Sequence, residues 1–313
     1  GIKELNEFEV AAFGYEANYV RVFVPGNTFV RTFSNQFSTS LDIRPAVAWS
    51  DKEGLRRFVG KFSDMASFRI DRKSGEGTDL LEALDPLGLD PLDSNLTAYN
   101  SSVRNTLYYD RTSRAWSVDH TYQNDQGKTL LLNGFESRAR ERNQVRLRVN
   151  ATRRWTVDVE GEQERTSVRS DLLEGRNYSI DAQAVRPRVT WQPNTSFRAA
   201  MLYKYTEKAN DAELGGEEAL LQDLGLELRY NAPGKGSVQM TASVVEIDFN
   251  GEVNSSLGND MLAGLKPGTN VTWNLTLQRN LSQHLQVDIT YNGRRSEGVP
   301  TVHVGGAQVR AYF

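Results

Sequence analysis

The chain ends in the amphipathic segment Val304-Gly305-Gly306-Ala307-Gln308-Val309-Arg310-Ala311-Tyr312-Phe313. Successive side chains of a β-strand point to opposite faces of its sheet. If this segment is extended, one face carries small, apolar and aromatic side chains, at Ala307, Val309, Ala311 and Phe313. The other face carries Gln308, Arg310 and Tyr312. The segment therefore predicts a strand whose sheet separates an apolar environment from a polar one, provided that the rest of the chain repeats this pattern.

The pattern is repeated in a hairpin predicted around residues 152–154. Antiparallel pairing about this turn sets Val145, Leu147, Val149 and Ala151 opposite Gly161, Val159, Val157 and Trp155. On the other face it sets Arg148 opposite Asp158 and Arg146 opposite Glu160. Cross-strand partners stabilise a sheet and specify its register, and opposite charges are favourable partners. Both faces therefore support the same hairpin.

Two more hairpins follow the same rule. Around residues 231–236, antiparallel pairing matches Tyr230, Leu228, Leu226 and Leu224 with Val238, Met240, Ala242 and Val244. Further along, segments 271–277 and 285–291 match Leu277, Leu275, Trp273 and Val271 with Leu285, Val287, Ile289 and Tyr291. In both hairpins one face is apolar, so the sequence predicts an antiparallel sheet with one apolar and one polar face.

The spacing of the remaining amphipathic segments predicts how the strands are connected. We expect strands near 300–313, 284–294, 269–279, 236–249, 219–230, 195–208, 176–191, 154–166, 144–152, 114–123, 101–110, 62–72 and 28–45, with a poorer candidate near 16–24. Alternate links are short, at 280–283, 231–235, 192–194, 153 and 111–113. The links between them are mostly long, at 250–268, 209–218, 167–175, 124–143 and 73–100, whereas 295–299 and 46–61 break the alternation. Transmembrane β-barrels alternate in this way, with short periplasmic turns and longer external loops.

Aromatic residues gather at the expected strand ends. Trp116, Trp155, Trp191, Tyr230 and Phe313 lie beside predicted short turns, and Tyr122, Tyr178, Tyr205 and Tyr291 lie toward the opposite ends. Two aromatic bands at the headgroup levels are typical of membrane β-barrels. Aromatic residues are also common in strands generally, and between these two interpretations the sequence favours the bands.

Composition narrows the class of protein. No window approaches the roughly 18 consecutive apolar residues of a membrane helix, which excludes a helical membrane protein. The chain has no Cys and a net charge of −3, so it excludes thiol chemistry and gives no support to a nucleic-acid partner. A mean hydropathy of −0.55 is compatible with a membrane barrel, because only alternate residues face lipid.

Two internal stretches resemble a known group of proteins. One runs from Arg31 through Phe37 to Pro45, and the other from Thr112 through Phe135 to Arg138. Together with the closing strand they resemble the C-terminal region of large, poorly characterised outer-membrane β-barrel proteins of the Bacteroidota. The resemblance implies an all-β, antiparallel transmembrane β-barrel of about 14 strands over residues 1–313, in the outer membrane of a Gram-negative bacterium.

The same resemblance implies partners. Outer-membrane lipid and lipopolysaccharide would surround the barrel, and other outer-membrane or surface proteins would join it in a complex. The terminal aromatic residue, Phe313, would be part of the signal read by the barrel-assembly machinery. Members of the group are longer than this chain and no signal peptide is visible at Gly1, so we expect either a mature protein or the C-terminal part of a longer one.

The charged pairs of the first hairpin are the main candidate site inside the barrel. Arg146, Arg148, Asp158, Glu160 and Glu162 would point into the lumen. A charged lining sets the selectivity of a pore, whereas charges that match pair by pair form a stabilising ladder. The sequence favours the ladder. Two links are further candidates. The link 73–100, with repeated Asp-Pro-Leu units, is a candidate partner-docking or plug loop. The link 46–61 is a candidate amphipathic helix, because Leu55, Phe58 and Val59 share a helical face.

We expect a non-enzymatic, porin-like pore or a membrane scaffold in a larger assembly, without cofactor or metal. His120, His284 and His303 have no companions at the spacing of a helical zinc site. A hydrolase carried by the barrel is one alternative, because triads are recognised by geometry and not by spacing. A soluble β-sandwich that binds a ligand is the other, and it would shield Leu147, Trp155, Val157 and Leu275 with protein.

Overall fold

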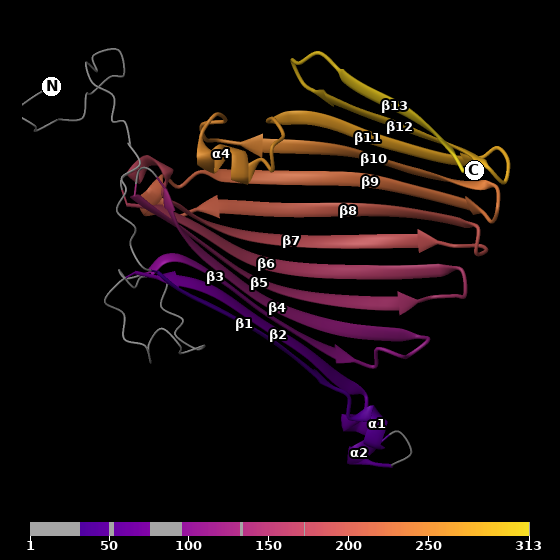
Figure 1. Cartoon of the computed structure of the whole chain (residues 1–313), viewed down its shortest axis with the longest axis horizontal. Helices are drawn as coiled ribbons and strands as arrows, with labels where there is room; N and C mark the ends of the chain where they lie inside the picture. The colour runs from indigo at the N-terminus through magenta and orange to yellow at the C-terminus, as the bar shows by residue number, and fades with distance from the viewer. Residues whose placement is uncertain (1–31, 50–52, 76–95, 132–133, 172, 313) are drawn as a thin grey trace, which may run out of the picture.

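The computed structural model of the chain describes residues 32–49, 53–75, 96–131, 134–171 and 173–312. These residues form one antiparallel sheet of 13 strands whose neighbours in space are also neighbours in sequence (Figure 1). The first seven strands are β1 (Phe33–Ile43), β2 (Phe62–Ser74), β3 (Leu96–Tyr109), β4 (Trp116–Leu131), β5 (Gly134–Asn150), β6 (Trp155–Ser170) and β7 (Tyr178–Trp191). The others are β8 (Phe197–Asn210), β9 (Glu218–Ala232), β10 (Gly236–Phe249), β11 (Gly268–Asn280), β12 (Leu285–Ser296) and β13 (Val302–Ala311).

The predicted fold class is confirmed: the protein is all-β and antiparallel, and each described strand overlaps an expected segment. The sheet curves, and β1 and β13 lie at its two ends (Figure 1). Neighbouring strands of this meander run in opposite directions, so β1 and β13 run in the same direction. The expected strand at 16–24 lies outside the described residues. The described residues form a single sheet, which does not fit the two packed sheets of a β-sandwich.

The links divide into two edges. We call one of them the turn edge; it carries the links 44–61, 110–115, 151–154, 192–196, 233–235 and 281–284. The loop edge carries 75–95, 132–133, 171–177, 211–217, 250–267 and 297–301. Short helices occur at both edges: α1 (Ala46–Trp49) and α2 (Leu55–Val59) at the turn edge, and α4 (Ser256–Met261), with the 3-10 turns Glu174–Arg176 and Ala212–Leu214, at the loop edge. No described helix is long and apolar enough to cross a membrane.

Two of the three predicted hairpins have the expected register. Leu147 faces Val159 in the β5–β6 pair, and Leu228 faces Met240 in the β9–β10 pair. The prediction for β11 and β12 was wrong, because Leu277 faces Ile289 instead of Leu285. The predicted and observed partners differ by an even number of residues, so every side chain stays on its predicted face. Alternation alone does not detect such a slip.

The expected long link at 124–143 was also wrong. β4 continues to Leu131 and β5 begins at Gly134, so the hairpin continues well beyond the amphipathic segments. In this outer part both faces carry polar side chains, as in Gln123-Asn124-Asp125-Gln126-Gly127-Lys128. Because both faces are polar here, apolar and polar residues do not alternate, which explains why the pattern predicted a loop.

Candidate functional site

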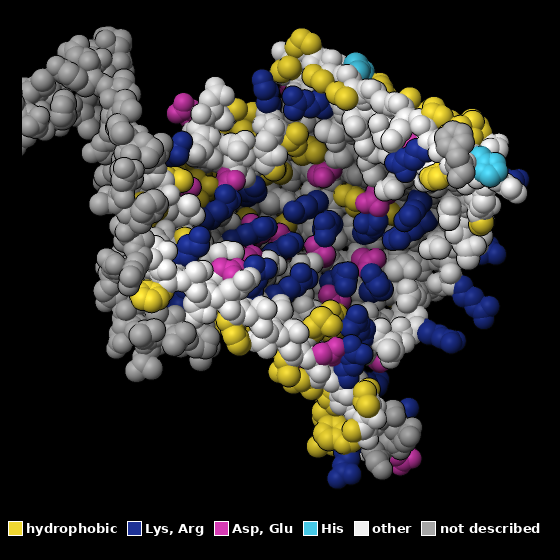
Figure 2. All heavy atoms as spheres, in the orientation of Figure 1, with side chains coloured by type: hydrophobic (Ala, Val, Ile, Leu, Met, Phe, Trp, Pro, Cys, Tyr) yellow, Lys and Arg dark blue, Asp and Glu magenta, His cyan; other side chains and the backbone are white. Residues whose placement is uncertain are grey.

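The inner face of the sheet is the face that carries the predicted ladder residues, and its charges gather over the middle strands (Figure 2). The register places Asp119 of β4, Arg146 of β5, Glu160 of β6 and Arg186 of β7 in one row across four strands. Their charges alternate along this row. Because each charge has an opposite charge on a neighbouring strand, the row supports the sheet as well as lining it.

The contacts within this network differ in part from the predicted pairs. Arg148 donates to Asp158 at 2.8 Å, as expected. Arg146 lies opposite Glu160 in the ladder, yet its guanidinium contacts Asp119 at 3.0 Å. Glu160 instead accepts from Arg186 at 2.5 Å. The sequence of one hairpin does not show this arrangement, because β4 and β7 supply the competing partners.

The network continues toward the loop edge. Glu162 accepts from Arg142, and Glu164 accepts from Arg140 at 2.6 Å. Each of the five predicted ladder residues therefore has an ion-pair partner on a neighbouring strand. This pairing leaves few unpaired charges among the residues of the network.

The inner face changes character over the last strands. On β10, β11 and β12 it carries hydroxyl and amide side chains, at Thr241, Ser243, Thr272, Asn274, Thr290 and Asn292. A depression of about 220 Å³ at β8–β11 is lined in part by these groups, together with Asp223 and Glu227. The inner face thus combines a central ion-pair network with a region in which hydroxyl and amide groups predominate.

The segment 250–267 folds onto the inner face at the loop edge, where the sequence predicts only an external link. Met261 and Leu262, at the end of α4, are fully buried. They pack against apolar side chains of four strands, namely Val168, Tyr178, Ile180, Ala219, Leu221, Val245 and Ile247. These strand residues lie on the inner face, so this part of it is apolar and is covered by the segment.

Polar contacts fix the segment in place. The Asp260 carboxylate accepts from Arg138 at 2.8 Å and from the hydroxyl of Tyr178. The Asp260 carbonyl accepts from the ammonium of Lys208 at 2.9 Å. Ser255 caps α4 by accepting from the backbone N–H of Gly258 at 2.8 Å. Asp260 therefore joins β5, β7 and β8 to one loop.

Tyr178 was assigned wrongly to an outer aromatic band. It begins β7 on the inner face, opposite Val168, and is 4% exposed. The sequence does contain a signal for this inward fold. Leu257, Met261, Leu262 and Leu265 recur at helical spacing inside an otherwise polar loop, and such spacing predicts a helix that packs on a surface.

The outer face carries the apolar set predicted from the hairpins. Large apolar side chains on it are exposed, among them Leu147 at 39%, Trp155 at 45% and Val189 at 40%. A row of aromatic rings follows the turn edge, with Phe58, Phe62, Tyr109 and Trp116 in successive contact at 4.9–5.4 Å between ring centroids. Farther along the edge, Trp155, Trp191 and Phe197 continue the row. This row agrees with the aromatic band predicted beside the short turns.

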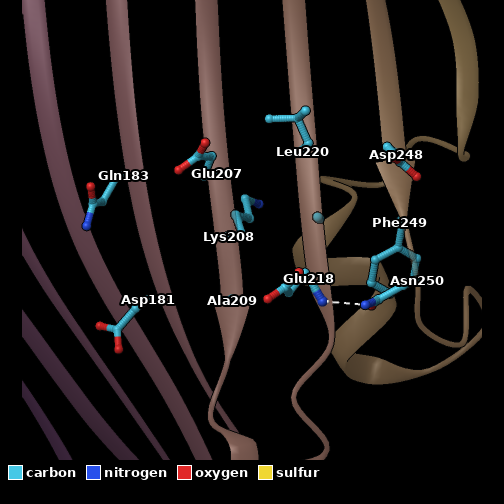
Figure 3. A pocket seen from close by; sticks show the side chains of 11 residues that line it. Asp181, Gln183, Glu207, Lys208, Ala209, Glu218, Leu220, Asp248, Phe249 and Asn250 are labelled. Carbon is cyan, nitrogen blue, oxygen red and sulfur yellow. Dashed lines mark hydrogen bonds between the residues drawn. The ribbon is translucent and has the colours of Figure 1, made fainter.

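A pocket of about 510 Å³ lies at the loop edge of β7–β10 (Figure 3). Four exposed carboxylates line it, those of Asp181, Glu207, Glu218 and Asp248. Asp181 pairs with Arg165 at 2.7 Å and Glu207 accepts from the hydroxyl of Tyr205 at 2.7 Å. In the described part of the chain no group of three or more His, Cys, Asp or Glu is arranged to hold a metal ion, so the pocket is an acidic surface feature.

The remaining candidates are dispersed or lie outside the described residues. His120 lies on β4, His284 precedes β12 and His303 lies on β13, where its ring stacks on Tyr291. Phe313 lies outside the described residues. So does most of the loop predicted at 73–100, because β2 extends to Ser74 and β3 begins at Leu96. The expected helix in 46–61 is present as α2.

Comparison with known proteins finds solved structures of low similarity to this chain. The sequence matches no protein-family model and no curated protein. CdiB from Acinetobacter baumannii is similar at 9% identity with a TM-score of 0.33, over 90% of this chain and 60% of that chain. The translocator domain of autotransporter NalP from Neisseria meningitidis is similar at 10% identity with a TM-score of 0.21, over 80% of this chain and 82% of that chain. This chain thus spans 60% of the length of CdiB.

Proposed function

We propose that this chain is an integral β-barrel protein of the outer membrane of a Gram-negative bacterium and that it forms a pore. The observation that carries the proposal is the opposite polarity of the two faces of one sheet. Exposed Leu, Val, Met and Trp side chains cover the outer face, and ion pairs with hydroxyl and amide groups cover the inner face. Lipid on one side and water on the other satisfy both faces.

The exposed apolar side chains of the outer face do not fit a surface that is in contact with water. Soluble monomers rarely expose contiguous apolar patches beyond a few hundred Å². Here exposed apolar residues occur on the outer face from β5 through β10, for example Val145, Val159, Val185, Met201, Leu226 and Met240. The aromatic row at the turn edge provides the amphipathic rings that membrane interfaces favour. The turn edge is then periplasmic and the loop edge external.

The inner face suggests what the pore would pass. Because Arg146, Arg148, Asp158, Glu160 and Glu162 are all paired, they offer few free charges to a passing ion. We therefore expect weak selectivity between cations and anions. The segment 250–267 covers part of the inner face at the external end and would narrow the opening there.

Planar-bilayer recording tests the pore. The purified full chain, refolded in detergent, should give stable conductance steps with nearly equal permeability to K⁺ and Cl⁻. Replacing Glu160 and Glu162 with Gln should leave unpaired Arg side chains and shift the reversal potential toward anion selectivity. Membrane insertion without any conductance would contradict the pore and leave the membrane location standing.

A scaffold in a larger assembly is the second candidate, and the open ends of the sheet favour it. Among the described residues, the outer edges of β1 and β13 have no neighbouring strand. A strand from a partner protein fits such an edge. Conductance that appears only in the presence of a co-purified partner would support this candidate. Conductance by the chain alone, if it is lost when residues 1–31 are deleted, would instead support a barrel that this chain closes by itself.

A further inference from the structure

The two edges of the sheet carry opposite charge. Among the residues that the structure describes, the links of the turn edge contain nine Lys and Arg against two Asp and Glu. Those of the loop edge contain two Lys and Arg against eight Asp and Glu. The chain as a whole is close to neutral, with a net charge of −3. Its charges are therefore separated along the strand direction, and composition alone does not show this separation.

The cations of the turn edge are exposed. Arg56 and Arg57 lie on α2, and Arg153 and Arg154 lie in the β5–β6 turn; all four are exposed and have no ion-pair partner among the described residues. Two neighbours are held by local contacts. Lys61 donates to Asp110 at 3.0 Å, which raises the pKa of this ammonium, and Arg111 stacks over the ring of Tyr108 at 4.4 Å. The lysine and the arginines therefore present a positive surface at neutral pH.

Apolar side chains occur beside these cations. On α2, Leu55 is 77% exposed and Phe58 is 51% exposed. The ring of Phe58 begins the aromatic row that continues through Phe62 and Tyr109. A helix with exposed apolar and basic side chains, next to interfacial aromatic rings, has the chemistry of a segment that lies in the headgroup region. Charge and apolar exposure thus point to the same kind of partner.

We infer that the turn edge binds the anionic headgroups of the phospholipid leaflet on its side of the membrane, with α2 lying in that leaflet. The inference rests on the proposed membrane location and adds the chemistry of the lipid. Anionic phospholipid attracts clustered Lys and Arg near a membrane surface. The acidic loop edge has the opposite preference, so the charge separation also favours one orientation across the bilayer.

The lipid preference is measured with spin-labelled lipids around the protein reconstituted in mixed phosphatidylcholine and phosphatidylglycerol vesicles. Wild type should hold labelled phosphatidylglycerol in preference to labelled phosphatidylcholine. The variant with Arg56→Gln, Arg57→Gln, Arg153→Gln and Arg154→Gln should lose at least about half of that preference, since one cation near an anionic leaflet contributes roughly fivefold to binding. High salt should weaken the wild-type preference, because the Debye length falls from about 10 Å at 0.1 M to about 3 Å at 1 M.

A matched control removes four cations from the loop edge or its strand ends. Arg165, Arg169, Arg176 and Lys266 are exposed, and changing each to Gln gives the same net charge as the test variant. This control should keep the phosphatidylglycerol preference. An equal loss in both variants would overturn the inference, because the effect would then follow total charge and not the turn edge.

Three other outcomes separate the possible failures. Insertion is scored independently, by resistance to carbonate extraction from the same vesicles. Wild type that fails to insert contradicts the proposed membrane location itself, whereas insertion without a phosphatidylglycerol preference overturns only the present inference. The wild type could instead prefer lipopolysaccharide over phosphatidylglycerol and lose that preference when Arg56, Arg57, Arg153 and Arg154 are replaced. That result would assign the turn edge to the other leaflet and would also overturn the inference.

Discussion

Replacing Leu147 with Arg distinguishes a lipid-facing outer face from an aqueous one. Leu147 lies on β5 between Val118 of β4 and Val159 of β6, in the middle of an apolar run that ends at Trp155 on the turn side. An Arg in the middle of the lipid face of a barrel costs about 2–4 kcal/mol. In water the same change at a side chain that is already 39% exposed should stay within about 0.5 kcal/mol.

The two expectations differ enough to measure. A loss of about 2–4 kcal/mol lowers the ratio of folded to unfolded protein by roughly 30-fold to roughly 700-fold. Urea titration of protein in phospholipid vesicles, followed by tryptophan fluorescence, reports this ratio. We expect the midpoint for Leu147→Arg to fall sharply, or insertion to fail.

Gln144→Arg is the matched control on the same strand. Gln144 lies on the inner face, between Thr121 and Glu162 in the ladder, so the new cation faces water and an acidic neighbour. The control should insert and unfold almost as wild type does. A neutral effect of Leu147→Arg, or equal damage from both substitutions, would refute the assignment of the faces.

Three further predictions concern the loop segment, the sheet and the C-terminus. Asp260→Asn weakens the anchor of segment 250–267 and should expose it to limited proteolysis while the sheet stays folded; an unchanged digest, read by mass spectrometry, would contradict that role. Gly293→Ala places a methyl group 2.1 Å from the Trp273 ring and should lower the free energy of unfolding in urea by about 1–3 kcal/mol. Gly305→Ala is the control, because the nearest atom to its methyl group is 4.0 Å away, and it should lower that free energy much less. Deleting Phe313 should lower the amount of folded protein in cells and leave refolding in detergent largely intact, since even full burial of a Phe is worth only about 1.5–3 kcal/mol; equal losses in both settings would argue for packing alone.

The β11–β12 hairpin shows what amphipathic patterning does not specify. The sequence predicts both faces correctly, but it sets Trp273 opposite Ile289, whereas the structure sets it opposite Gly293. The Trp273 ring lies where a side chain at position 293 would be. A glycine covered by a cross-strand aromatic ring is a recognised way of fixing register. A search for apolar pairs overlooks it because glycine contributes no side chain to the pair.

The inner face shows a similar limit for charged residues. The sequence of one hairpin identifies Arg146 and Glu160 as neighbours, and the ladder confirms that they are. Their ion pairs are nevertheless made with Asp119 and Arg186, on the strands to either side. In a sheet each inward residue has two lateral neighbours, so partner choice depends on at least four strands at once. Only the complete register contains that information.

The parity of the strands connects the fold to the choice between pore and scaffold. Since β1 and β13 run in the same direction, they cannot complete an antiparallel barrel by pairing with each other. These strands have 11 and 10 residues, and each unpaired backbone group that faces hydrocarbon costs several kcal/mol. Two open edges would therefore exceed the roughly 5–15 kcal/mol by which folded proteins are stable. If the sheet spans the outer membrane as proposed, closing it as an antiparallel barrel with an even number of strands takes an odd number of additional strands between them. The sequence predicts one candidate near 16–24, and a strand from a second protein fits the same position. A pore and a scaffold thus differ in which chain supplies that strand.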